Sequence, residues 1–149
     1  MKVTVLRGIS GAGKSTWIKN NAPDAFVVSA DLFFMVDGEY KFDINKLEEA
    51  HRHTFKAFLE ALADKKEWII VDNTNVHAWE YSPYVLAAGA YGYEVELLTF
   101  ECSADVALSR KRLVPEDTLR NIAEIFVRET ERMPRKFKGI NKTLLCTSN

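Results

Sequence analysis

The sequence predicts an α/β protein in which helices cover both faces of a parallel β-sheet. Three observations support this fold class. Residues 8–15 read Gly-Ile-Ser-Gly-Ala-Gly-Lys-Ser, a glycine-rich phosphate-binding pattern. Short apolar segments, typical of buried parallel strands, alternate with segments of helical periodicity. Polar residues directly follow several of these apolar segments. Together these features predict the three-layer P-loop NTPase fold with a helical lid.

The predicted strands are short, rich in branched side chains and followed by polar or turn-forming residues. They cover residues 2–7, 26–29, 68–71 and 93–100, with a further short strand at 143–146. The segments between them carry helical periodicity or residues that start helices. The expected helices cover residues 16–20, 44–64, 77–90, 103–112 and a segment from 115 to about 133.

Individual residues justify the boundaries of these elements. The helix at 44–64 carries apolar side chains about one turn apart, and Gly92 separates the next helix from the strand that follows. Ser103 is expected to cap the helix after that strand. Pro115 fits the first position of the following helix, where its missing N–H costs nothing.

Length and charge limit the functional classes. The 149 residues make one ordinary domain, so residues 1–149 are treated as a single unit with a lid over about residues 103–133. The net charge of −1 excludes a uniformly basic nucleic-acid-binding protein. Residues 101–149 nevertheless carry ten basic and seven acidic residues, 10 − 7 = +3, which favours a local basic surface there.

The sequence gives no indication of membrane insertion or export. Its apolar runs are all shorter than the roughly 18 residues of a membrane span, and its N-terminus leads directly into a predicted strand. Cys102 and Cys146 lack the spacing of a metal site. We therefore expect a cytoplasmic protein with two reduced, buried thiols and no contact with a membrane.

Residues 8–16 are expected to bind ATP or another nucleoside triphosphate. Glycines let the backbone wrap a phosphate at a helix N-terminus, Lys14 reaches the β- and γ-phosphates, and the Ser15 hydroxyl binds Mg²⁺. The alternative is a glycine-rich turn that binds nothing, which the flanking strand and helix disfavour. The expected nucleotide-binding residues are Gly8, Ser10, Gly11, Ala12, Gly13, Lys14, Ser15 and Thr16.

Two carboxylates follow predicted strands and are expected at the same edge of the sheet. Ligands of parallel sheets bind beyond the carboxyl ends of the strands, where Gly8, Asp31, Asp72 and Glu101 are predicted to lie. One of Asp31 and Asp72 can support Mg²⁺ while the other accepts the proton of an acceptor hydroxyl. The alternative for each is a turn or cap role. The pattern alone does not tell which of Asp31 and Asp72 supports Mg²⁺ and which accepts the proton.

Basic and aromatic clusters leave alternatives open. Arg110, Lys111 and Arg112 can supply a lid arginine to the triphosphate or form a solvated helix end. The second basic cluster, which surrounds Phe137, can follow a nucleic-acid backbone or form an exposed tail. It comprises Arg128, Arg132, Arg135, Lys136 and Lys138. Four aromatic residues can stack on a base or pack in the core, namely Phe33, Phe34, Tyr40 and Phe42.

The sequence resembles the polynucleotide kinase family, phage-type and without a phosphatase domain, over about residues 2–135. The matching features are residues 8–17, Ser29-Ala30-Asp31, Asp72-Asn73-Thr74-Asn75, and Leu113-Val114-Pro115 with Leu119-Arg120. The resemblance implies that Asp31 is the general base and that Arg110 or Arg112 is the lid arginine. It also implies that Asp72 or Asn73 belongs to the acceptor and metal network.

One position departs from the family pattern. Phage polynucleotide kinases carry an arginine three residues after the catalytic aspartate, and this chain has Phe34 there. The expected acceptor pocket is therefore less basic and more apolar than that of a 5′-end kinase. Its expected residues are Phe33, Phe34, Asp72, Asn73 and Asn75.

Three functions are compatible with these residues. The favoured one is an ATP-dependent kinase that uses Mg²⁺ and phosphorylates a nucleic-acid hydroxyl, either a 5′-hydroxyl end or a hydroxymethyl group on a modified DNA base. DNA is favoured over RNA, and a virus-encoded protein that acts in the host cytoplasm is compatible with this resemblance. The second function is a nucleoside or other small-metabolite kinase. The third is an ATPase or nucleotide-binding module without an acceptor.

Overall fold

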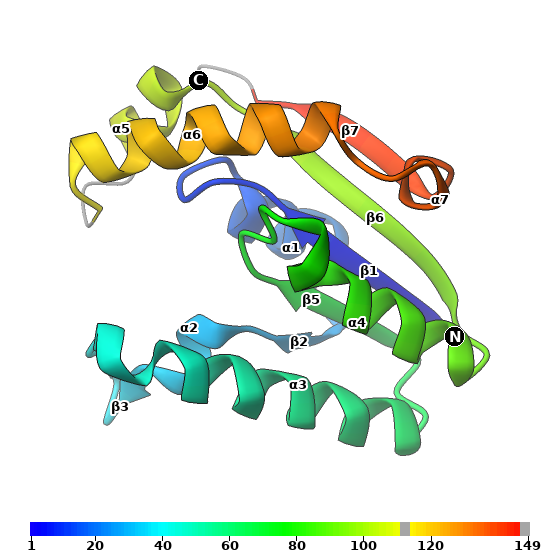
Figure 1. The fold of residues 1–149 in the computed structure, drawn as a ribbon. Coiled ribbons are helices and arrows are strands. Elements are labelled where there is room, and N and C mark those ends of the chain that lie inside the picture. Colours follow the sequence, from blue (N-terminus) through cyan, green and yellow to red (C-terminus); the bar gives the residue numbers. More distant parts are fainter. Residues whose placement is uncertain (111–113, 147–149) are drawn as a thin grey trace.

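A five-stranded parallel β-sheet forms the centre of the computed structural model, which describes residues 1–110 and 114–146 (Figure 1). The strand order is β2-β5-β1-β6-β7, and every pairing in this sheet is parallel. The strands are β1 (Lys2–Arg7), β2 (Phe26–Val28), β5 (Trp68–Asp72), β6 (Glu94–Glu101) and β7 (Asn141–Leu145). This arrangement confirms the predicted α/β P-loop fold class.

Helices cover both faces of the sheet because its central strands are apolar on both sides. Alternate side chains of a strand face opposite sides of the sheet. Val3 and Val5 of β1 face one side and join one buried cluster, and Leu98 and Phe100 of β6 face the other side and join the second cluster. The first cluster includes side chains of α3 (Leu47–Ala63) and α4 (Ala78–Ala90). The second includes side chains of α1 (Lys14–Asn21), α5 (Ala104–Arg110) and α6 (Glu116–Glu131).

The segment between β2 and α3 contains elements that the sequence analysis missed. Helix α2 (Ala30–Phe33) is followed by a hairpin of β3 (Met35–Val36) and β4 (Glu39–Tyr40), and a 3₁₀ turn (Ile44–Lys46) leads into α3. The two hairpin-turn residues, Asp37 and Gly38, have φ values of 51° and 82°. Asp-Gly is a favoured sequence for such a two-residue turn because both residues tolerate positive φ.

The basic segment near the C-terminus is folded, which corrects the exposed-tail alternative. Residues Arg135–Lys138 form α7, and its Phe137 is only 3% exposed. The Phe137 ring packs edge-to-face on Tyr81 of α4, with centroids 5.1 Å apart. Helix α7 leads into the first residue of β7, so it lies at the amino end of the sheet, opposite the loop between β1 and α1 (Figure 1).

Arg7, the last residue of β1, joins α6 to the sheet from a fully buried position. Its guanidinium donates hydrogen bonds of 2.8–3.2 Å to the Asn75 and Val76 carbonyls and to the Thr99 and Thr130 hydroxyls. It also lies 4.5 Å from the ring centroid of Phe126 on α6. Burial lowers the pKa of Arg7, and the charges of Glu80 and Glu129 partly offset that effect. The second half of α6 is therefore part of the core.

The described residues contain no helix long and apolar enough to cross a membrane.

Candidate active site

The phosphate-binding loop between β1 and α1 requires glycine at two positions. Gly11 and Gly13 have φ values of 88° and 102°, in the left-handed region that other residues rarely adopt. A Cβ atom built on Gly11 would lie 2.6 Å from the carbonyl oxygen of Ala107 on α5. Helix α5 therefore packs directly on the loop.

The loop ends at the N-terminus of α1. Its N-cap residue, Gly13, has no side chain to cap the first N–H groups of the helix, which are the groups that bind phosphate in such loops. Lys14 begins the helix, and its ammonium group donates to the carbonyls of Gly8 at 2.6 Å and Ile9 at 3.1 Å. Ser15 and Thr16 are exposed in the first turn, whereas Ala12 is buried.

The segment between β5 and α4 connects the loop to the candidate base. The Thr74 carbonyl accepts a 3.0 Å hydrogen bond from the Gly8 N–H. The Asn73 side-chain oxygen accepts a 2.9 Å hydrogen bond from the N–H of Ala30, which directly precedes Asp31. Two predicted site segments that are far apart in sequence are thus joined through residues 73 and 74.

Asp31 and Asp72 both lie at the carboxyl edge of the sheet. Asp72 is the half-buried last residue of β5, next to Leu6 of β1 in the strand register. Asp31 is the exposed second residue of α2, and its N–H donates to the capping Ser29 hydroxyl at 3.1 Å. Tyr40 was predicted only as a ring that could stack on a base or pack in the core, and its O–H donates to Asp31 Oδ1 at 3.1 Å.

Two residues predicted to bind the acceptor are buried instead. Phe34 is 3% exposed and packs in a small cluster with Ala30 and Ala50. Asn75 is 1% exposed, and its side-chain amide donates to the Leu6 carbonyl at 2.8 Å. Both side chains have structural roles, because neither reaches the surface where an acceptor would approach. Phe33 remains half-buried beside Phe34.

Arg110 lies next to the phosphate-binding loop. It is the last residue of α5, is exposed, and its Nη1 atom would lie 3.6 Å from a Cβ atom built on Gly13. The same Nη1 donates to the Cys146 sulfur at 3.0 Å, and the half-buried Cys102 thiol donates to that sulfur at 2.7 Å. Burial is the largest cause that raises the pKa of Cys102 to about 12. The other candidate lid arginine, Arg112, lies outside the described residues, as does Lys111.

The candidate magnesium ligands are oxygen donors. Ser15 supplies a hydroxyl from the first turn of α1, and Asp72 supplies a carboxylate from the end of β5. Both are hard ligands of the kind that bind Mg²⁺ together with substrate phosphates and water. The described residues contain no group of three or more His, Cys, Asp or Glu side chains that could hold a metal ion by themselves. The chemistry of these two oxygen donors therefore suits Mg²⁺, with substrate phosphates and water as the remaining ligands.

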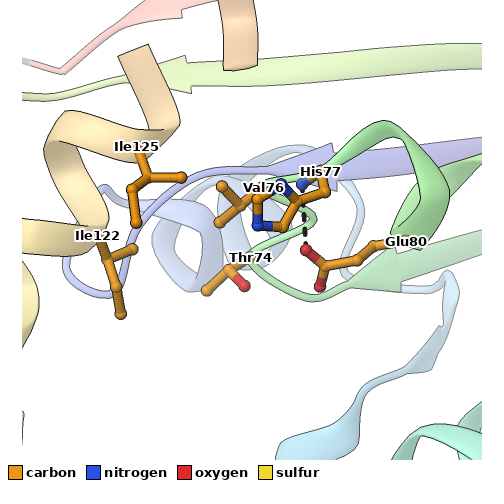
Figure 2. Close-up of a pocket in the computed structure, with 6 residues that line it drawn as sticks. All are labelled: Thr74, Val76, His77, Glu80, Ile122 and Ile125. Carbon is orange, nitrogen blue, oxygen red and sulfur yellow. Dashed lines mark hydrogen bonds between the residues drawn. The ribbon is translucent and has the colours of Figure 1, made fainter. Parts of the chain in front are cut away.

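A small pocket lies beside this site, between the segment after β5 and helix α6 (Figure 2). Thr74, Val76, His77 and Glu80 line one side, and Ile122 and Ile125 line the other. The backbone N–H of His77 donates to Glu80 Oε1 at 3.0 Å, as Figure 2 shows. The cavity volume of the pocket is about 110 Å³, which is below the roughly 300 Å³ of the smallest ordinary ligand sites. The pocket is therefore too small to be the complete nucleotide or acceptor site.

Two solved structures share the fold at low sequence identity. A chain in the Pnkp1/Rnl/Hen1 RNA repair complex has a TM-score of 0.72 and 16% identity, and the alignment covers 89% of this chain and 46% of that chain. A gluconokinase from Sinorhizobium meliloti 1021 has a TM-score of 0.60 and 14% identity, with 98% and 83% coverage. The predicted resemblance therefore holds for a P-loop kinase-like fold and not for the phage-type enzymes specifically.

Sequence comparison identifies the family. NEDD4-binding protein 2 from Homo sapiens is 38% identical over 96 residues, which are 62% of this chain and only 5% of that protein. Residues 3–130 match the sequence profile of a family described as AAA domain. Because the profile match covers most of the chain, this protein belongs to the AAA domain family.

Proposed function

We propose that this protein is an ATP-dependent phosphotransferase that transfers the γ-phosphate to a hydroxyl group of a nucleic acid. The observation that carries the proposal is the pair of hydrogen bonds made by residues 73 and 74. Thr74 binds the start of the phosphate-binding loop, and Asn73 binds the first residue of the helix that carries Asp31. The proposed phosphate site and the candidate base are thus both hydrogen-bonded to the segment that follows β5.

The phosphate-binding loop would hold the triphosphate. The uncapped N–H groups of α1 would bind phosphate oxygens, and Lys14 would exchange its contacts with the Gly8 and Ile9 carbonyls for phosphate contacts. Ser15 and Asp72 would hold Mg²⁺, which when bound supplies charge neutralisation at the β- and γ-phosphates. Arg110 lies beside Gly13 and would stabilise charge on the migrating group.

Asp31 would act as the general base. Its carboxylate accepts the proton of the acceptor hydroxyl as the hydroxyl oxygen forms its bond to the γ-phosphorus. The bond from phosphorus to the bridging oxygen breaks, and the nucleoside diphosphate leaves with that oxygen. Exposure of Asp31 on α2 supports this role because an acceptor can reach the side chain from solvent.

Exposed apolar side chains beside Asp31 support an acceptor with aromatic or apolar groups. Leu32, Met35, Val36, Tyr40 and Phe42 are all exposed around the hairpin. Nucleobases provide such groups, and aromatic side chains are common stacking partners for single strands and flipped bases. One fold neighbour is a chain in an RNA repair complex, so the proposal includes RNA as well as DNA. Both 5′-hydroxyl ends and hydroxymethylated bases remain candidates.

A small-metabolite kinase is the second candidate, and the position of the basic cluster favours it. The cationic side chains of Arg135, Lys136 and Lys138 belong to α7 at the amino end of the sheet. They lie roughly the length of β7, about 15 Å, from the carboxyl edge. A short acceptor bound at Asp31 would not contact them. The gluconokinase, aligned over 98% of this chain, has a compatible fold.

The test is the transfer of labelled γ-phosphate from ATP in the presence of Mg²⁺ to a panel of acceptors. The panel contains 5′-hydroxyl DNA and RNA, end-blocked duplex DNA with hydroxymethylated pyrimidines, free nucleosides and gluconate. Label on a nucleic acid supports the proposal, and label on nucleosides or gluconate alone supports the second candidate. Label found only in free phosphate contradicts both and identifies an ATPase.

Variants connect the activity to the proposed residues. Lys14→Ala is expected to weaken ATP binding, whereas Asp31→Asn is expected to keep ATP binding and lower kcat by roughly 100-fold or more. Asp24→Asn is the matched control, because Asp24 is exposed in the turn between α1 and β2. Retention of full transfer by Asp31→Asn would exclude Asp31 as the base.

A further inference from the structure

We propose that Tyr40 is a positioning residue for Asp31, which it holds through a hydrogen bond from the β3–β4 hairpin. This inference rests on the proposed function, because Asp31 matters as a base only if the protein transfers phosphate to a hydroxyl. The contact that carries it is the 3.1 Å hydrogen bond from the Tyr40 O–H to Asp31 Oδ1.

The hairpin holds the Tyr40 ring through several contacts. The ring is stacked with that of Phe42 at a centroid distance of 6.5 Å and packs edge-to-face on Phe34 at 6.2 Å. Phe34 is buried against Ala50 of α3. The N–H of Lys41 also donates to the Phe34 carbonyl at 2.8 Å. Tyr40 is therefore anchored to the core, although 44% of its surface is exposed.

This anchoring matters because Asp31 itself lies on a four-residue helix at the surface. An exposed aspartate samples several rotamers, and a general base must be oriented toward its proton donor. A hydrogen bond to Oδ1 selects one orientation and assigns proton transfer to the second carboxylate oxygen, Oδ2. The hairpin would thereby convert a mobile carboxylate into an oriented one.

The phenol is suited to this task because it remains a donor. Burial raises the pKa of Tyr40 to about 12, and the charge and hydrogen bond of Asp31 add to the effect. At neutral pH the hydroxyl therefore keeps its proton and can donate to the carboxylate. It does not compete with Asp31 as a base.

The first experiment tests the contact without depending on activity. The chain has five tyrosines, so protein labelled with ¹³C at the phenolic carbon is expected to give five signals. Tyr40→Phe removes one signal and thereby assigns it. Asp31→Asn is expected to move the Tyr40 signal while leaving the signal of Tyr91, an exposed tyrosine at the end of α4, in place. A Tyr40 signal that Asp31→Asn does not move would overturn the proposal.

The second experiment tests positioning with an acceptor that the wild-type protein phosphorylates. Tyr40→Phe keeps the ring and its packing, and it is expected to lower kcat by roughly tenfold with the KM for ATP unchanged. In the Asp31→Asn background the same change is expected to lower kcat no further, because the two groups act through one contact. Tyr91→Phe is the matched control and is expected to change kcat less than twofold.

The outcomes separate the two proposals. An unchanged or increased kcat in Tyr40→Phe, or an additional tenfold loss in the Asp31→Asn background, overturns the positioning role while leaving the kinase activity intact. If the wild-type protein phosphorylates no acceptor, the proposed function and the catalytic role of Tyr40 fail together. The ¹³C experiment then still decides whether the hydrogen bond between Tyr40 and Asp31 exists in solution.

Discussion

The side-chain oxygen of Asn73 accepts a hydrogen bond from the backbone N–H of Ala30 at 2.9 Å, and so joins the end of β5 to the helix that carries Asp31. Ala30 is buried, whereas Asp31 beside it is exposed. The amide of Asn73 therefore orients the start of α2 from the inside while the carboxylate faces solvent. This relationship gives Asn73 a supporting role that does not require direct contact with an acceptor.

Substitution of Asn73 is expected to affect catalysis more than nucleotide binding. Asn73→Ala leaves the Ala30 N–H without its partner, which costs about 1 kcal/mol of folding free energy. We expect kcat to fall about tenfold because Asp31 loses its fixed backbone position, while the affinity for ATP changes less than twofold. Urea unfolding, calorimetric ATP binding and the transfer assay measure the three quantities. Asn121→Ala on the exposed face of α6 is the control. Loss of stability with undiminished kcat would show that Asn73 only supports the fold.

Removal of the buried Arg7 side chain is expected to destabilise the whole protein. Arg7→Met leaves two carbonyls and two hydroxyls without their guanidinium partner, at a cost of about 3 kcal/mol. Arg120→Met is the control. It breaks ion pairs to Asp105 and Glu116 from a side chain that is 46% exposed, where solvent screens the charges, so it is expected to cost much less stability than Arg7→Met. Urea unfolding of both variants measures the difference, and equal losses would contradict the central role of Arg7.

Two glycine substitutions, one between α4 and β6 and one in the phosphate-binding loop, separate backbone strain from steric conflict. Gly92→Ala introduces a side chain at a φ of 81° with no described atom within 4 Å of its Cβ, so it is expected to cost about 1–2 kcal/mol of stability. Gly11→Ala meets the same strain and also the Ala107 carbonyl at 2.6 Å. It is expected to displace α5 and weaken ATP binding at least tenfold, measured by calorimetry. Unchanged ATP affinity would mean that the loop adapts freely.

Glu96 is expected to make stability depend on pH in the acidic range. Burial alone would raise its pKa, but hydrogen bonds from Thr4 and Lys2 and the charges of Lys2 and Lys142 outweigh burial and lower it. A carboxyl whose pKa is lower in the folded state stabilises the protein above its unfolded pKa of about 4.3. That contribution is lost as the pH falls through the folded-state pKa.

Thermal unfolding between pH 3 and pH 7 measures this effect. Glu96→Gln is expected to be less stable than wild type at pH 7, and this difference is expected to shrink as the pH falls and the wild-type carboxyl takes up a proton. Glu94→Gln, at the exposed first residue of β6, is the matched control for removal of a carboxylate from the same strand. A stability difference between Glu96→Gln and wild type that is constant with pH would contradict the prediction.

The main elements of the fold were predictable because their local signals agree with their environment. The strand at residues 68–71 is a continuous apolar run, and the structure extends it only to Asp72. The last strand begins at Asn141 rather than Thr143, because it is an edge strand that pairs with β6 alone and has polar residues at its start. The polar residues at the start of β7 carry no sequence signal for a strand.

The short elements around the site were only partly predictable from local patterns, because Asp37-Gly38 indicates a turn but does not identify the strands on either side of it. Each strand of the β3–β4 hairpin has only two residues, which is too few for an alternating pattern to emerge. Phe33 and Phe34 are adjacent and chemically identical, yet only Phe34 is fully buried. Both rings contact α3, and the difference in their burial depends on tertiary packing that residues 30–42 do not encode by themselves.

The same limitation applies to the asparagines after β5. Asn73 and Asn75 both occur in the motif that suggested acceptor binding, but Asn75 adopts a φ of 48° and faces the core. Arg7 gave no signal at all, because a charged residue beside a loop is usually exposed. Its burial follows from partners on β6, α6 and the segment after β5, which come together only in the folded chain.

The position of β1 in the sheet also has a consequence for synthesis on the ribosome. Lys2 pairs with Trp68 and with Glu94, so the first strand has no partner until β5 has emerged, and it is flanked on both sides only after β6 follows. Until then Val3, Val5 and Leu6 are exposed on a nascent chain that holds the phosphate-binding sequence but not its structure. Nucleotide binding during translation is therefore restricted to chains in which most of the sheet has already left the exit tunnel.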